Sequence, residues 1–317
     1  MADSSQSTSA IRLASAGNPP VEHDIKQSDV DLSVVIPCFN ERHAVEQMMQ
    51  ELERALAPIK SFEIIVVDDG STDGTAKVLD TLEVGSSSMR VIRHNINKGY
   101  GGALKTGIRH AQGRFVAITD ADGTYPNDRI PDLLARAEEG ADMVVGARVK
   151  DDVGHSKIRA FPKAFMRRYC VWLTRQPIPD MNSGLRVFKR NVIERFLAYL
   201  PDTFSFTTTV TIAFMTNSYC VEYVPIVYGQ RVGQSKISPF KDTIRFVQLI
   251  LRFGLYFAPL RVFGPFILFL WAVFFGVAGH SVFVEQDLTQ TDLLLLNFAT
   301  TATMLALVAD MIDKRLR

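Results

Sequence analysis

The stretch "FVAITDADGTYP", residues 115–126, joins an apolar run to a polar loop that carries two carboxylates. The run from Phe115 to Ile118 is typical of a strand that is buried on both faces, and Asp120 and Asp122 follow its end. In an extended chain, side chains two positions apart point to the same side. Such a pair predicts hard oxygen ligands for Mg²⁺ or Mn²⁺, and the alternative is a simple turn cap.

The same change from strand to polar loop recurs along the chain. We expect strands at 32–37, 62–67, 89–93, 114–119, 141–147 and 220–229, and helices at 45–56, 76–82, 103–111, 130–139, 157–174 and 191–200. Asn40 is the expected N-cap of the first helix, and residues 180–190 are expected to run from a loop into a strand. Apolar strands that alternate with helices predict an α/β fold with a mainly parallel sheet, covered on both sides.

Acidic or amide side chains follow three of these strands. The residues at the three strand ends are Asn40, Glu41, Asp68, Asp69, Asp120 and Asp122. Ligands of parallel α/β sheets bind outside the carboxyl ends of the strands. Several carboxylates at one edge repel each other unless cations or hydrogen-bond donors are present. The sequence therefore predicts a ligand site at this edge.

The composition excludes some other functions. The 317 residues carry a net charge of +1, which argues against a nucleic-acid binder. Three cysteines without a CxxC pair fit a reduced compartment and offer no thiolate metal site. The histidines lack metal-ligand spacing, so His94 and His110 are expected at the surface. Residues 1–30 contain no apolar run of signal-peptide length and are expected to be a disordered leader.

The last sixty residues are much more apolar than the rest. Residues 262–284 contain no Asp, Glu, Lys or Arg, and a second apolar run covers 293–309. About twenty helical residues cross a hydrocarbon core of roughly 30 Å. We therefore expect a transmembrane hairpin with a cytoplasmic tail within 261–317. Residues 238–260 mix basic and apolar side chains at helical spacing, which favours an amphipathic helix in the membrane interface over a core helix.

The charges around the hairpin predict its orientation. Its loop, residues 285–292, holds three acidic residues and no Lys or Arg, whereas basic residues lie on both flanks: Arg252, Arg261, Lys314, Arg315 and Arg317. Basic flanks stay on the cytoplasmic side of a membrane. We expect a multi-pass protein of the inner (plasma) membrane, with its catalytic domain in the cytoplasm.

Four motifs together resemble the family 2 inverting glycosyltransferases of the GT-A fold. They are "VVIPCFNE" (34–41), "IIVVDDGSTDGT" (64–75), "NKGYGGALKTG" (97–107) and "ITDADGTYP" (118–126). Two more, "DMNSGLRVFKR" (180–190) and "RVGQSK" (231–236), are similar to the polyprenyl-phosphate glycosyltransferases, which include dolichol-phosphate mannose synthases. The resemblance places a GT-A domain at residues 31–237, and the hairpin is similar to the short anchor of bacterial members.

The resemblance implies a role for each matching position on the donor side. The residues that surround or contact the nucleotide sugar are Pro37, Asn40, Glu41, Asp68, Asp69, Lys98, Asp120, Ala121, Arg231 and Lys236, with Ser235 in the same basic loop. Asp122 matches the metal-binding acid of the D-x-D element, and Asp120 lies near the sugar and the ion. Thr124 stands where many relatives have Gln, and Gln234 where they commonly have Glu.

The acceptor side is implied in the same way. Arg148, Ser183 and Arg186 match the residues that hold the acceptor phosphate, whereas Arg159, Arg167 and Arg168 are expected to be solvated. A phosphate nucleophile is already anionic near pH 7, so such an enzyme needs cations rather than a strong base.

The resemblance thus implies the transfer of one hexose, from UDP-glucose or GDP-mannose, to undecaprenyl or dolichyl phosphate. The reaction would be a metal-assisted inverting displacement at the cytosolic membrane face. The partners would be the nucleotide sugar, the lipid and the membrane, and a homo-oligomer is left open. A processive polysaccharide synthase is the second enzyme class, and it is disfavoured because no Q-x-x-R-W motif is present. A non-catalytic membrane scaffold is the alternative of another class.

Overall fold

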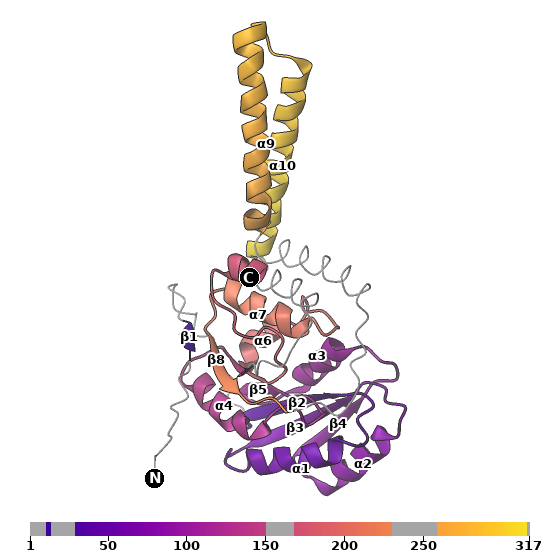
Figure 1. Cartoon of the computed structure of the whole chain (residues 1–317). Coiled ribbons are helices and arrows are strands. Elements are labelled where there is room, and N and C mark those ends of the chain that lie inside the picture. The colour runs from indigo at the N-terminus through magenta and orange to yellow at the C-terminus, as the bar shows by residue number, and fades with distance from the viewer. Residues whose placement is uncertain (1–10, 14–28, 150–167, 230–258, 316–317) are drawn as a thin grey trace. The chain divides into compact units, whose positions relative to one another are not determined.

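The computed structural model describes residues 11–13, 29–149, 168–229 and 259–315 (Figure 1). The chain divides into two compact units, and each is considered by itself. The first comprises residues 1–171 and 176–236, and the second comprises 172–175 and 237–317.

The first unit contains an eight-stranded sheet in the order β1-β8-β6-β7-β5-β2-β3-β4. Its strands are β1 (Ile11–Leu13), β2 (Leu32–Cys38), β3 (Phe62–Asp68), β4 (Met89–Arg93), β5 (Phe115–Ile118), β6 (Met143–Arg148), β7 (Arg186–Lys189) and β8 (Val221–Ile226). The pairs β2–β3, β2–β5, β3–β4 and β6–β8 are parallel. The mainly parallel α/β sheet expected from the sequence is therefore confirmed.

One strand departs from the simple alternation. β7 is inserted between β5 and β6 and runs antiparallel to both. Because it runs in the opposite direction, its first residue, Arg186, lies level with Ile118 at the carboxyl end of β5. The loop that precedes β7 is thereby brought to the edge where the parallel strands end.

Helices cover both faces of the sheet (Figure 1). They are α1 (Val45–Leu56), α2 (Thr75–Gly85), α3 (Tyr100–His110), α4 (Ile130–Glu138), α6 (Arg190–Phe196) and α7 (Phe206–Thr216), with a 3-10 turn at Asn127–Arg129. The apolar side chains of α1 and α4 share one core with Val34 and Ile36 of β2. Val35 points to the other face, where α3 crosses β2 so closely that a Cβ on Gly107 would lie 2.3 Å from it.

The helical periodicity identified α1 correctly, since all five of its apolar positions are buried. Asn40 is not its N-cap, however: the helix begins at Val45, and Asn40 has a left-handed backbone with φ of 59°. Sequence patterns also missed α7, whose Thr-rich stretch lacks a polar face and whose hydroxyls are buried. Part of the expected helix 157–174 is described, and residues 168–174 are helical.

The first thirty residues are not without structure. Ile11–Leu13 form β1, which pairs antiparallel with β8, so the disordered-leader prediction is wrong for these three residues. A three-residue strand carries too little pattern to be recognised in a polar segment. Residues 1–10 and 14–28 lie outside the described part of the chain.

The second unit contains α9 (Pro259–His280), a π-helical turn (Ser281–Glu285) and α10 (Gln290–Arg315). The two long helices lie side by side and antiparallel (Figure 1), and Trp271 Nε1 donates to Thr303 Oγ1 across them at 3.2 Å. The segments Pro259–Val284 and Gln290–Ile312 are each long and apolar enough to cross a membrane. This agrees with the two apolar helices expected, whereas residues 238–258 of the expected interfacial helix lie outside the described residues.

Candidate active site

The site lies where the parallel strands of the first unit end. Cys38 is level with Asp68, and Asp68 is level with Arg93, so the loops that follow β2, β3 and β4 leave the sheet together. β5 lies on the other side of β2, and the loop before β7 joins it. The edge therefore gathers residues from across the sequence, as expected for a parallel α/β sheet.

The side chain of Asn40 links two of these loops. Its Oδ1 accepts a hydrogen bond from the Thr72 backbone amide at 2.8 Å. The backbone amide of Asn40 donates to Ser71 Oγ at 3.0 Å. The Glu41 amide donates to Thr75 Oγ1 at 3.0 Å. Asn40 tolerates a left-handed backbone better than most residues, so it can make this sharp exit from β2. Its expected position by the nucleotide remains a prediction.

Asp68 and Asp69 are both almost fully buried, and their carboxylates shape loops. Asp68 Oδ1 accepts from the Ser71 amide at 2.9 Å. Asp69 Oδ1 accepts from the Lys98 amide, and its Oδ2 from the Gly99 amide, both at 2.8 Å. A buried carboxylate needs such donors. Direct contact of Asp69 with a nucleotide would require these bonds to be shared.

His94 contacts Asp69, which corrects the expectation that this histidine is at the surface. It is buried, its Nδ1 lies 2.7 Å from Asp69 Oδ1, and its Nε2 lies 2.9 Å from Thr106 Oγ1. No local pattern predicts this contact, because His94 and Asp69 follow different strands and meet only in the fold. His110, by contrast, is exposed as expected.

The two aspartates of the 119–125 loop have different surroundings. Asp120 Oδ1 accepts a hydrogen bond from the Tyr100 hydroxyl at 2.9 Å. Asp122 Oδ1 accepts from the amide and the hydroxyl of Thr124, at 3.1 and 2.6 Å. Thr124 thus completes the turn-capping role that was the alternative for Asp122. Both carboxylates are partly exposed, whereas Ala121 between them is buried.

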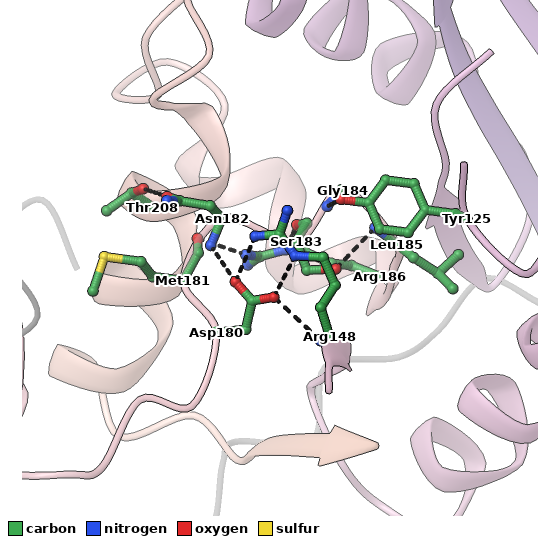
Figure 2. A network of polar contacts seen from close by, with 10 residues as sticks. All are labelled: Tyr125, Arg148, Asp180, Met181, Asn182, Ser183, Gly184, Leu185, Arg186 and Thr208. Carbon is green, nitrogen blue, oxygen red and sulfur yellow. Dashed lines mark hydrogen bonds and ion pairs between the residues drawn. The ribbon is translucent and has the colours of Figure 1, made fainter. Parts of the chain in front are cut away.

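Arg148, at the end of β6, is paired with Asp180 in the loop before β7 (Figure 2). The guanidinium donates through Nε at 2.7 Å to Oδ2 and through Nη2 at 3.0 Å to Oδ1. Its Cζ also lies 5.3 Å from the centre of the Tyr228 ring. Burial alone would raise the pKa of Asp180, but the hydrogen bond and charge of Arg148 outweigh it and hold that pKa below its usual value.

Arg186 is fully buried, which does not fit its expected role as a direct phosphate ligand. Its guanidinium donates to the carbonyl oxygens of Ser183 and Met181, at 2.8 and 2.9 Å (Figure 2). It also donates to Thr211 Oγ1 at 2.7 Å. Desolvation lowers its pKa. We correct the expectation: Arg186 anchors the loop before β7 to α7, because its Nε, Nη1 and Nη2 each donate to an acceptor inside the chain.

The loop held in this way touches the acidic loop. The Gly184 amide donates to the Tyr125 hydroxyl at 2.7 Å, and a Cβ on Gly184 would lie 3.0 Å from Asp120 Oδ1. Ser183 is buried, and the Leu185 amide donates weakly to its hydroxyl at 3.4 Å. Residues 183–184 therefore form one wall of the space beside Asp120.

Other expected site residues are less informative. Pro37 lies within β2, and the side chain of Lys98 is exposed. Arg231, Gln234, Ser235 and Lys236 lie outside the described residues, as do Arg159 and Arg167. Arg168 is exposed, as expected. Among the described residues, no group of three or more His, Cys, Asp or Glu side chains is arranged to hold a metal ion.

The architecture, a mainly parallel sheet with acidic loops at its carboxyl edge and β7 inserted beside them, defines a GT-A glycosyltransferase domain. Solved structures support this fold. Glucosyl-3-phosphoglycerate synthase from Mycobacterium tuberculosis, in complex with Mn²⁺, UDP and phosphoglyceric acid, superposes with a TM-score of 0.54 at 20% identity. The match covers 71% of this chain and 79% of that one. Another complex of that protein contains Mn²⁺, UDP-glucose and phosphoglyceric acid, with a TM-score of 0.53.

The chain belongs to glycosyl transferase family 2, whose model matches residues 33–197.

Curated relatives carry one shared description, undecaprenyl-phosphate 4-deoxy-4-formamido-L-arabinose transferase. The protein from Klebsiella pneumoniae subsp. pneumoniae is 29% identical over 210 residues, which is 65% of this chain and 62% of that one. One from Pseudomonas fluorescens is 30% identical over 213 residues, 66% and 61% of the two chains. One from Pseudomonas savastanoi pv. phaseolicola is 28% identical over 271 residues, 80% and 78%. This chain spans about three fifths of the length of the relatives from Klebsiella pneumoniae and Pseudomonas fluorescens.

Proposed function

We propose that this enzyme transfers one sugar from a nucleotide sugar to a polyprenyl phosphate, such as undecaprenyl phosphate, at the cytosolic face of a membrane. The observation that carries the proposal is the juxtaposition of Asp120 with the loop before β7, whose Asp180 holds Arg148 beside it. The carboxylate of Asp120, proposed to face the donor, thereby lies near the cation of Arg148, proposed to hold the anionic acceptor. The relatives named as undecaprenyl-phosphate transferases support the same acceptor.

The reaction joins two anions, so binding and charge neutralisation dominate its chemistry. An oxygen of the lipid phosphate would attack the anomeric carbon, and the bond from that carbon to the nucleoside diphosphate would break with inversion. The leaving diphosphate takes the electron pair. Arg148 would hold the attacking phosphate, because a guanidinium suits phosphate oxygens. The basic loop of Arg231 and Lys236 would hold the leaving diphosphate.

The residues of the acidic loop fit a divalent ion. Asp120 and Asp122 present two partly exposed carboxylates from one loop. Mg²⁺ and Mn²⁺ are bound by one or two carboxylates together with substrate phosphates and water. Asp122 Oδ1 is engaged by Thr124, and a carboxylate has lone pairs for more than one partner. Such an ion, when bound, supplies positive charge to the leaving diphosphate.

The membrane segment supports a lipid acceptor. α9 and α10 expose many large apolar side chains, among them Phe269, Phe275 and Leu294. In a lipid bilayer these side chains contact hydrocarbon instead of water, so their exposure does not destabilise the protein. The loop between the helices is acidic and the flanks are basic. This favours an orientation in the inner membrane with the catalytic unit on the cytoplasmic side. The hairpin then keeps the enzyme on the surface that contains its acceptor.

The sugar is a separate question within the proposal. UDP-glucose and GDP-mannose are the donors inferred from the sequence, and the names of the relatives add a 4-deoxy-4-formamido-L-arabinose donor. Fold alone does not set sugar specificity.

The decisive experiment measures transfer by the full-length chain in detergent. Purified enzyme receives radiolabelled UDP-glucose, GDP-mannose or a nucleotide-linked 4-deoxy-4-formamido-L-arabinose, a short polyprenyl phosphate and Mn²⁺. Label in the lipid fraction with one donor, one sugar per lipid, is the expected result. Long polymeric products would instead indicate a processive synthase. No labelled lipid with any nucleotide sugar would overturn the proposal in favour of a scaffold.

A further inference from the structure

Tyr100 is the first residue of α3, and its hydroxyl donates to Asp120 Oδ1 at 2.9 Å. Tyr100 belongs to the motif at residues 97–107, and no pattern in the sequence assigns a role to its side chain. The hydrogen bond spans two loops that follow different strands, β4 and β5. Three sets of contacts fix Tyr100 in place.

The backbone before Tyr100 is held by a buried carboxylate. Asp69 accepts hydrogen bonds from the Lys98 and Gly99 amides, and His94 contacts the same carboxylate from the other side. Gly99 adopts a φ of 89°, which disfavours other residues. The start of α3 therefore has one strongly determined position relative to β3 and β4.

The backbone after Tyr100 is held by the loop that follows α6. The Gly102 amide donates to the Asp202 carbonyl at 3.1 Å, and a Cβ on Gly101 would lie only 2.1 Å from the Pro201 carbonyl oxygen. The glycines of this motif thus allow close packing of two backbones.

The side chain of Tyr100 is constrained as well. Its ring stacks on Phe204 with centroids 5.2 Å apart and planes 17° apart, although Phe204 itself is 80% exposed. A Cβ on Gly184 would lie 3.0 Å from the Tyr100 hydroxyl and 3.0 Å from Asp120 Oδ1. A side chain at position 184 would therefore crowd both the hydroxyl and the carboxylate.

The hydrogen bond has one direction, because a phenol hydroxyl can donate and an ionised carboxylate can only accept.

We propose that Tyr100 is a positioning residue that fixes the carboxylate of Asp120 for the donor and its divalent ion. This inference rests on the proposed function. A preorganised carboxylate needs no reorganisation when the donor binds or reacts, whereas a loose one samples rotamers that contribute nothing. The hydroxyl of Tyr100 therefore contributes to turnover through Asp120, without contacting the reacting atoms.

The test compares Tyr100→Phe with wild type in the full-length detergent-solubilised chain. Tyr199→Phe is the matched control, since among described residues the Tyr199 hydroxyl makes no hydrogen bond. Free Mn²⁺, counted by electron paramagnetic resonance during titration with Mn²⁺ alone, reports on the site without turnover. We expect Tyr100→Phe to lower kcat about tenfold and weaken Mn²⁺ binding several-fold, with donor KM and the melting temperature almost unchanged.

Gly184→Ala provides an independent variant, because its added carbon would press on the same hydrogen bond. It should reproduce the losses in kcat and Mn²⁺ affinity. Wild-type kcat and Mn²⁺ affinity in Tyr100→Phe, or equal losses in Tyr199→Phe, would overturn the inference. A wild-type chain that transfers no sugar would overturn the proposed function instead, and Mn²⁺ binding would still decide whether Tyr100 positions Asp120.

Discussion

Arg148 and Asp180 form a two-pronged ion pair, with N–O distances of 2.7 and 3.0 Å, that ties the end of β6 to the loop before β7. Within the described part of the chain, Nη1 of Arg148 makes no hydrogen bond. The pair therefore fixes the guanidinium and leaves Nη1 for the phosphate oxygen that we propose it binds. A fixed cation loses less entropy on binding than a mobile one.

Arg148→Ala should remove the cation that holds the acceptor. Loss of a charge-assisted phosphate contact costs about 1.5–3 kcal/mol, which corresponds to a ten- to hundredfold lower kcat/KM for polyprenyl phosphate. The KM of the donor should change little. Arg168→Ala, at an exposed position, is the control and should be almost silent. Steady-state kinetics with varied acceptor checks this, and equal effects of the two variants would indicate a general charge effect.

Asp180 should make stability depend on pH in a defined direction. Its pKa is depressed in the folded state, so its stabilisation is present above the unfolded pKa of about 3.9 and is lost as pH falls through the folded value. The melting temperatures of wild type and Asp180→Asn should therefore differ clearly at pH 7, and the difference should shrink as pH falls below about 3.9 toward the lower folded-state pKa. Asp132→Asn, which breaks an exposed pair with Arg129, is the control and should have little effect at pH 7. A difference between wild type and Asp180→Asn that stays constant as pH is lowered from 7 to below about 3.9 would contradict the prediction.

Arg186→Lys should act mainly on stability. Lysine cannot reach two carbonyl oxygens and a hydroxyl with the geometry of a guanidinium, so buried acceptors lose their donors. We expect a loss of about 2–4 kcal/mol in unfolding free energy, seen as a lower melting temperature. Arg195→Lys, on the exposed side of α6, is the control. A normal melting temperature with selectively lost use of the acceptor would restore the phosphate role inferred from the sequence.

Asp122→Asn separates the metal role from the turn cap. The Asn oxygen can accept both hydrogen bonds from Thr124, so the loop should keep its shape while one charge is lost. Turnover should fall at least tenfold, and wild-type activity should vanish in excess chelator. Asp128→Asn, at an exposed position, should remain active. A folded Asp122→Asn enzyme that is fully active in chelator would refute metal binding at this loop.

The membrane orientation can be tested at the turn between α9 and α10. Leu288 is 54% exposed and lies outside the α10 cap formed by Thr289 and Asp292. In a Cys220→Ser background, Leu288→Cys should react with an impermeant thiol reagent in intact cells. Cys38 and Cys170 are buried and should not contribute. Labelling only after permeabilisation would reverse the proposed orientation.

The sequence by itself determined the α/β class, the positions of most strands and the acidic loops at their ends. This was possible because apolar residues recur with a characteristic spacing in buried strands and in amphipathic helices. That spacing involves only residues close together in the chain. The same locality explains its identification of the two apolar helices. The same locality explains the wrong N-cap prediction at Asn40, because the local sequence of an Asn before a helix is the same whether it caps the helix or links two loops.

Only the tertiary structure decided which side chains meet. The Tyr100 hydroxyl reaches Asp120, His94 reaches Asp69, and Arg186 lies buried against Thr211, all across elements that are distant in sequence. A motif gives the type of a residue but not its burial, and burial decides whether an arginine can bind a ligand or must hold the chain together. The antiparallel insertion of β7 decided the last of these contacts, because it placed Arg186 and the loop before it at the carboxyl edge of the sheet.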